Sequence, residues 1–141
     1  MPNFNNGMNP VVHFEMPAED RKRMIDFYTK AFGWQAKQMG AEYGDYVVVT
    51  TSESDPSDMS GRPKNPGMIN GGFYQKTDDT MSQYPSVVIA VEDLKESIEK
   101  VKSAGGKIHG EIQDIPNVGM FVSVIDTEGN RISMLQPKMV S

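Results

Sequence analysis

Two segments of the chain carry apolar residues at the spacing that defines one face of an α-helix. In residues 20–34 the apolar positions recur at intervals of about three and four, and the same intervals recur in residues 93–108. Asp93 and Glu96 form a capping-box-like start to the second segment, and Gly105, followed by another glycine, supplies a stop signal. The pattern predicts two helices, whose starts lie 73 residues apart.

Short apolar or alternating segments, which are typical of strands, precede and follow each predicted helix. The order of one strand, one helix and three strands occurs twice along the chain. The sequence therefore predicts two βαβββ modules, about residues 10–76 and 85–137, in a single domain of residues 1–141. The predicted strands are residues 10–17, 34–40, 45–52, 68–76, 85–93, 107–113, 119–126 and 130–137.

A shift of 73 residues aligns the two modules and pairs His13 with Ser86 and Asp20 with Asp93. Two connections between predicted strands differ in character. Residues 126–130 have the composition of a tight turn between antiparallel strands. Residues 53–67 are rich in Pro, Ser, Asp and Gly without periodicity, which predicts an exposed loop that is either a lid or a tolerated insertion.

Composition narrows the class of protein. The 141 residues include no cysteine, which excludes disulfides, thiolate metal sites and cysteine nucleophiles. The net charge of −5 comes with no basic cluster, so nucleic acid is not an expected partner. No apolar run has the length of a membrane span or of a secretory signal. We therefore expect a cytoplasmic globular protein.

Three stretches resemble the glyoxalase/bleomycin resistance protein/extradiol dioxygenase (vicinal oxygen chelate) superfamily: HFEMPAEDRKRMIDFYTKAFGW, VVIAVEDLKESIEKVKSAGGKI and DTEGNRISMLQP. The resemblance covers about residues 10–137. It implies an α+β fold in which two tandem βαβββ modules form a curved eight-stranded mixed sheet with a central cleft. It also implies a homodimer that binds a small molecule. It does not specify an activity, because the fold carries lyases, epimerases, dioxygenases and binding proteins.

In metal-dependent members of this superfamily, each module contributes two metal ligands. The resemblance places these positions at His13, near Gly72, at Ser86 and at Ser133, so only His13 retains a ligand side chain. One imidazole does not hold a catalytic divalent ion, which needs three or four protein ligands. No cofactor is therefore expected. A non-standard site with Glu15 beside His13 stays open, because alternate residues of a strand share a face.

Strand alternation assigns the candidate site residues. With Phe14 and Met16 packed under the first helix, His13 and Glu15 point to the opposite face. The same reasoning places Ser86, Arg131 and Ser133 in the cleft. Tyr46 and Tyr74 lie on bordering strands and Trp34 follows the first helix, where aromatic rings could stack on a ligand. The candidate catalytic residues are His13 and Glu15, and the candidate ligand-binding residues are Trp34, Tyr46, Tyr74, Ser86, Arg131 and Ser133.

Three functions agree with these residues to different degrees. The first is metal-free binding of a small organic molecule in a cleft of mixed polarity. The second is a lyase or isomerase of the glyoxalase type, with His13 and Glu15 as acid and base on an enolisable carbonyl and Arg131 as the nearby cation. The third, a serine hydrolase, is disfavoured because the sequence lacks a G-x-S-x-G nucleophile elbow. Whether the protein is an enzyme stays open.

Overall fold

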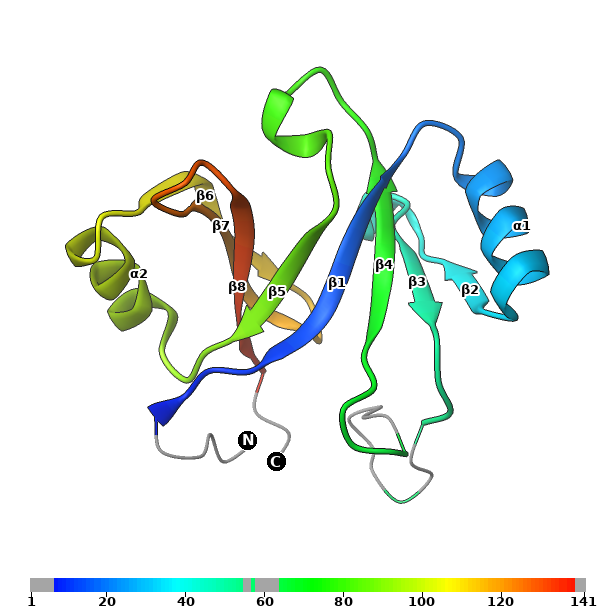
Figure 1. Cartoon of the computed structure of the whole chain (residues 1–141), viewed down its shortest axis with the longest axis horizontal. Helices are drawn as coiled ribbons and strands as arrows, with labels where there is room; N and C mark the ends of the chain where they lie inside the picture. The colour runs from blue at the N-terminus through cyan, green and yellow to red at the C-terminus, as the bar shows by residue number, and fades with distance from the viewer. Residues whose placement is uncertain (1–6, 55–56, 58–63, 139–141) are drawn as a thin grey trace. The chain divides into compact units, whose positions relative to one another are not determined.

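The computed structural model describes residues 7–54, 57 and 64–138 of the chain. Most of the predicted loop at 53–67 lies outside the described residues, and its described positions are exposed. Three strands follow each helix, as the sequence predicts (Figure 1). The elements are β1 (Val11–Ala18), α1 (Arg21–Phe32), β2 (Gln35–Gln38), β3 (Val47–Thr50), β4 (Asn70–Gln75), β5 (Ser86–Ala90), α2 (Leu94–Ser103), β6 (Lys107–Ile115), β7 (Gly119–Ile125) and β8 (Arg131–Pro137).

The chain divides into two compact units, each of which contains one of the two helices. The first unit is His13–Pro85, and the second combines Ser86 onward with the described residues up to Val12. In the first unit the strand order is β2-β3-β4-β1, with β1 parallel to β4. In the second it is β5-β8-β7-β6, with β5 parallel to β8. The other neighbours within each unit are antiparallel, which confirms the α+β class and the repeated βαβββ plan.

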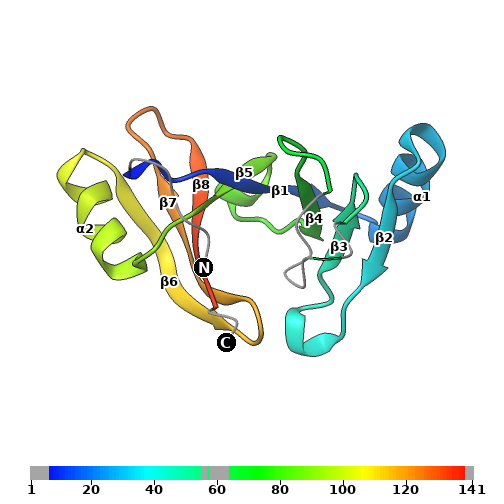
Figure 2. The ribbon, with the colours of Figure 1, turned by 90° about the horizontal axis from the view of Figure 1, so that it is seen from below.

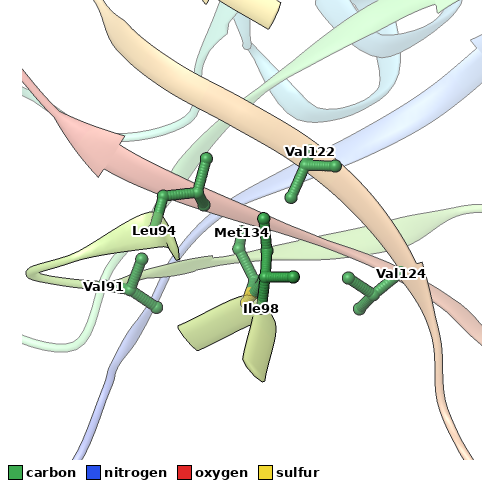
Figure 3. Close-up of a cluster of buried hydrophobic side chains, with 6 residues drawn as sticks. All are labelled: Val91, Leu94, Ile98, Val122, Val124 and Met134. Carbon is green, nitrogen blue, oxygen red and sulfur yellow. The ribbon is translucent and has the colours of Figure 1, made fainter. Parts of the chain in front are cut away.

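Each helix rests on the strands of its own unit. Figure 2 shows α1 beside β2 in the first unit and α2 beside β6 and β7 in the second. In the second unit, aliphatic side chains of α2 and of the neighbouring strands form a closed core (Figure 3). In the first unit, α1 has no fully buried residue and covers a smaller core. The buried residues of the core in the first unit are Ala18, Val47, Val49 and Phe73. Those of the core in the second unit are Val91, Leu94, Ile98, Val122, Val124 and Met134.

The helix ends follow from local chemistry that the sequence displays. The side chain of Asp20 accepts a hydrogen bond from the Arg23 N–H at 3.0 Å, and that of Asp93 accepts one from the Glu96 N–H at 3.1 Å. Gly33 ends α1 with a φ of 74°, a left-handed conformation that glycine adopts without strain. None of the helices among the described residues combines the length and apolar character needed to cross a membrane.

Replacing Asp20 or Asp93 with alanine lowers the free energy of unfolding by about 1 kcal/mol, because each change removes the acceptor that satisfies an N-terminal helix N–H. Urea denaturation of the single variants measures this. Asp26→Ala on the exposed side of α1 is the matched control and changes stability by less than about 0.5 kcal/mol. If Asp26→Ala lowered the free energy of unfolding equally, the loss in Asp20→Ala and Asp93→Ala would come from the removed negative charge and not from the capping hydrogen bond.

Candidate functional site

A hydrogen-bonded chain of three side chains lies on one sheet face of the first unit. The Tyr46 hydroxyl donates to Glu15 Oε2 at 3.0 Å, and His13 Nε2 lies 3.0 Å from the same hydroxyl. His13 and Glu15 are alternate residues of β1, so both side chains point to the face opposite Phe14. The structure thus brings together both predicted catalytic residues and one predicted ligand-binding tyrosine.

The connection from β2 to β3 places Tyr46 for this contact. The Met39 N–H donates to the Tyr46 carbonyl at 2.8 Å, which closes a tight connection between the two strands. Gly44 and Asp45 within it adopt φ angles of 65° and 56°. Left-handed residues reverse the chain in a short distance, so Tyr46 enters the sheet directly before β3. Its side chain shares a face with Val48, because Val47 is buried in the core beneath α1.

Gly72 makes the contact between Tyr46 and β1 sterically feasible. β4 lies between β3 and β1, and Gly72 pairs with Val48 on one side and with Glu15 on the other. A Cβ atom at residue 72 would lie 1.9 Å from Tyr46 Oη and 2.1 Å from its Cζ. The phenol ring therefore crosses β4 through the space that any larger residue at 72 would fill. The two consecutive glycines of β4 are the sequence signal for this close approach.

Burial sets the protonation of two of the three groups. The Tyr46 hydroxyl has one hydrogen, which it donates to Glu15, and His13 Nε2 lies within hydrogen-bond distance of the same oxygen. Burial lowers the pKa of His13 to about 4, so the imidazole is neutral at pH 7. Burial, and next the charge of Glu15, raise the pKa of Tyr46 well above its usual value, so the phenol keeps its proton.

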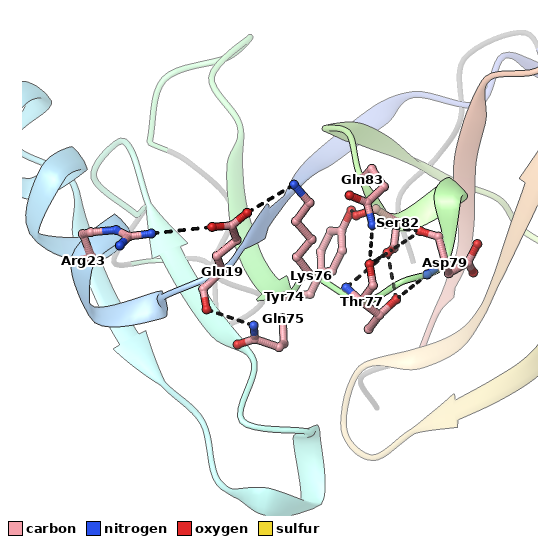
Figure 4. A network of polar contacts seen from close by, with 9 residues as sticks. All are labelled: Glu19, Arg23, Tyr74, Gln75, Lys76, Thr77, Asp79, Ser82 and Gln83. Atoms are coloured by element: carbon pink, nitrogen blue, oxygen red, sulfur yellow. Dashed lines mark hydrogen bonds and ion pairs between the residues drawn. The ribbon is translucent and has the colours of Figure 1, made fainter.

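Tyr74 lies on the same face as Gly72, two residues further along β4, but its hydroxyl is engaged elsewhere. The Tyr74 hydroxyl lies 3.0 Å from the Ser82 carbonyl and 3.2 Å from the Tyr84 carbonyl, and its single hydrogen is shared between these two acceptors. These carbonyls belong to the segment around a 3-10 turn at Thr80–Ser82, whose polar network Figure 4 shows. The Tyr74 hydroxyl thus anchors this segment.

The structure does not bring Trp34, a predicted ligand-binding residue, to the His13 group. Its ring stacks on Tyr28 with centroids 4.7 Å apart and lies 5.6 Å from the Phe14 ring. These neighbours belong to the α1 side of the sheet, opposite His13. Gly33 explains the placement, because its left-handed conformation turns the chain back so that Trp34 packs over the end of its own helix.

In the second unit, the predicted serines are buried. Ser133 is fully buried on β8, and its Oγ lies 3.3 Å from Ser123 Oγ. The register pairs Ser133 with Ser123 and Ser123 with His109, so all three share one sheet face. The sequence does not indicate that Ser123 and His109 lie beside Ser133, because strand register cannot be predicted from composition. Ser86 is also buried on β5, and no described residue forms a hydrogen bond with its Oγ.

Arg131 stands at the start of β8 opposite Ile125 and is half-buried. Arg131 and Ser133 are alternate residues of the strand and therefore share a face, as the sequence predicts. The predicted tight turn precedes β8. In it Asp126 accepts hydrogen bonds from the Glu128 and Asn130 N–H groups at 2.8 and 2.9 Å. The backbone and side-chain hydrogen bonds from Asn130 are the leading causes of a lowered pKa at Asp126.

The residues at the four expected ligand positions do not fit a divalent ion. Gly72 has no side chain, and the Tyr46 ring fills the space that one would take. A serine hydroxyl is a poor ligand, and that of Ser133 already contacts Ser123. Within the described part of the chain, no three His, Asp or Glu residues lie close enough to hold an ion. His13 Nε2 and Glu15 Oε2 instead converge on the hydroxyl of Tyr46.

Comparisons with known proteins agree on the family. The family model described as Glyoxalase/Bleomycin resistance protein/Dioxygenase superfamily matches residues 11–134. A glyoxylase-like domain-containing protein from Didymella fabae is 31% identical over 119 residues, which span 82% of this chain and 84% of that protein.

Solved structures show the same fold at much lower identity. Methylmalonyl-CoA epimerase from Mycobacterium tuberculosis has a TM-score of 0.62 and 13% identity, covering 99% of this chain and 94% of its own. A glyoxalase/bleomycin resistance protein/dioxygenase superfamily member from Vibrio splendidus 12B01 has a TM-score of 0.58 and 12% identity, covering 92% of this chain and 99% of its own. At these identities the likeness concerns the fold alone.

Proposed function

Because the chain belongs to the Glyoxalase/Bleomycin resistance protein/Dioxygenase superfamily, we propose that it binds a small organic molecule without the superfamily's usual four-ligand metal site. The observation that carries this proposal is the position of the Tyr46 side chain. Its hydroxyl contacts His13 and Glu15, the two residues best suited to ligate an ion. The ring also takes the space of a side chain at Gly72. The polar chain of His13, Glu15 and Tyr46 is the proposed binding site in the first unit.

The surroundings of these three hydrogen-bonded side chains suit an organic ligand of modest polarity. His13, Glu15 and Tyr46 are only partly buried, and Val48 on the same face is 37% exposed. A few polar groups beside an apolar surface are typical of small-molecule sites, where the polar groups orient the ligand. On the second unit, Ser86, Arg131 and Ser133 remain candidates for ligand binding.

A second candidate function is a lyase or isomerase that uses His13 and Glu15 as acid and base. The neutral imidazole, hydrogen-bonded through a phenol to a carboxylate, supports it. A general base works best with a pKa near the operating pH, whereas the pKa of His13 is about 4. At pH 7 the imidazole of His13 is therefore neutral but only a weak base. This favours a ligand-binding function over an enzyme that abstracts a proton with His13.

A ligand screen on the purified, untagged protein tests the proposal. Small organic compounds are tested by thermal shift, and each hit is titrated against the wild type and Tyr46→Phe. We expect Tyr46→Phe to weaken binding about tenfold, or by about 1.4 kcal/mol, because His13 and Glu15 lose the hydroxyl that holds both side chains in place. Tyr84→Phe removes a phenol hydroxyl from a ring that is 71% exposed and serves as the matched control.

Metal content separates the alternatives. Stoichiometric metal in the purified protein, lost in His13→Ala, would contradict metal-free binding. Turnover of a hit compound that disappears in His13→Ala, while its binding remains, would favour the lyase or isomerase. Unchanged affinity in Tyr46→Phe would remove the proposed site.

We also propose a cytoplasmic homodimer. The aromatic side chains of α1 support self-association, since Phe27 and Phe32 are 57% and 62% exposed and lie 6.2 Å apart between ring centroids. Beside them, β2 is an exposed edge strand, which can pair with another chain. Light scattering distinguishes the chain mass of 15.7 kDa from twice that value. A monomer at every concentration would reject the dimer.

A further inference from the structure

We propose that Tyr46 is a positioning residue that fixes His13 as the Nε2–H tautomer, so that Nδ1 is the nitrogen that accepts a hydrogen bond from a bound ligand. The tautomer of His13 is a property of the ligand-free protein. The role of Nδ1 as acceptor rests on the proposed binding function, and it predicts that the ligand carries a hydrogen-bond donor group.

The three hydrogen-bonded side chains share only two hydrogens if His13 and Tyr46 are neutral and Glu15 is a carboxylate. A phenol has one hydrogen, and the geometry directs it to Glu15 Oε2 at 3.0 Å. A contact of 3.0 Å between His13 Nε2 and the same oxygen is favourable only if Nε2 carries a hydrogen. The opposite tautomer would place two lone pairs against each other.

The phenol of Tyr46 does not easily turn its hydrogen from Glu15 to His13. A carboxylate is a stronger acceptor than a neutral imidazole, because hydrogen bonds to charged groups are the stronger ones. Tyr46 is also held in place by the sheet, with its ring lying against the backbone of Gly72. The tautomer of His13 is therefore set by Glu15, through Tyr46.

The other imidazole nitrogen of His13, Nδ1, is accessible to a ligand. The hydrogen bonds among the described residues include none to His13 Nδ1. Nor is Nδ1 among the buried polar side-chain atoms that lack a partner, so solvent or a ligand reaches it. In the Nε2–H tautomer, Nδ1 has a lone pair and no hydrogen. A donor group such as a hydroxyl, an amide N–H or an ammonium suits it.

Nitrogen NMR of the ligand-free protein at pH 7 tests the tautomer directly. The chain has two histidines, so His13→Gln assigns the signals of each. We expect one pyridine-like nitrogen at Nδ1 and a slowly exchanging hydrogen on Nε2 in the wild type. In Tyr46→Phe the Nε2 hydrogen loses its acceptor, and we expect its signal to disappear through exchange with water. Tyr84→Phe, the matched control, keeps both signals.

Gly72→Ala provides a second, independent test that retains the tyrosine. The added Cβ moves Tyr46 off His13, so the Nε2 hydrogen should exchange rapidly here too, in a protein whose fold is checked by its backbone spectrum. A hydrogen on Nδ1 in the wild type, or an unchanged Nε2 signal in both variants, would overturn the inference. Those outcomes do not depend on any ligand, whereas failure of the ligand screen leaves the tautomer result intact. The two proposals thus fail separately.

Discussion

Gly72→Ala destabilises the protein by about 2–3 kcal/mol, because the new methyl group overpacks the sheet and breaks hydrogen bonds to a carboxylate and an imidazole. The added Cβ atom would lie 1.9 Å from Tyr46 Oη, far inside contact distance. The Tyr46 ring holds the atoms nearest to the new Cβ, and moving it separates Tyr46 from both His13 and Glu15. Urea denaturation at pH 7 measures the loss.

A double-mutant cycle shows whether the cost arises from Tyr46. In a Tyr46→Ala background, Gly72→Ala should cost less than about 0.5 kcal/mol, since the ring that it collides with is gone. Gly71→Ala is the matched control. Its Cβ would lie 2.5 Å from the Phe14 ring on the opposite sheet face, so its cost should add to that of Tyr46→Ala without coupling. Full additivity between Gly72→Ala and Tyr46→Ala would refute the steric account.

Lowering the pH from 6.5 to 4 removes about 3 kcal/mol of stability through His13 alone, at about 1.4 kcal/mol for each unit of pKa difference. The pKa of His13 falls from 6.5 to about 4 on folding, chiefly through burial. Between these values the unfolded chain binds a proton that the folded protein does not. This contribution is therefore complete above pH 6.5 and is lost as the pH falls towards 4.

Comparison with His13→Gln isolates this effect from the titration of carboxyl groups. The free energy of unfolding is measured for both proteins by urea denaturation between pH 8 and pH 4. We expect the wild type to lose stability more steeply than the variant, and the two curves to run parallel above pH 7. Parallel curves over the whole range would show that His13 titrates alike in the folded and unfolded chain.

Local signals explain why the fold could be predicted from the sequence. The capping aspartates, Asp20 and Asp93, and the left-handed Gly33 act within one or two turns of chain, and each occurs where the periodicity places a helix end. Strand alternation likewise predicted the faces of β1 and β8, because its period depends on backbone geometry alone. The short 3-10 turn at Ala41–Tyr43 was missed, since one turn has no periodicity to detect.

The contacts within the site could not be predicted in the same way. Tyr46 and Gly72 are distant in sequence and meet only because β3 pairs with β4 in one register. A shift of one residue would place the ring against Phe73 or Gly71 instead. Trp34 shows the same limit, since the sequence placed it after a helix without indicating the face to which the chain turns.

The crossing of Tyr46 over Gly72 also constrains how this site could have evolved. A tyrosine at 46 in this conformation is compatible only with glycine at 72. Starting from an ancestor with a side chain at 72, the loss of that side chain had to come before the phenol could take its present place. Among descendants, reversion at 72 alone is then blocked. The two positions should therefore vary together, and a substitution at one should predict a substitution at the other.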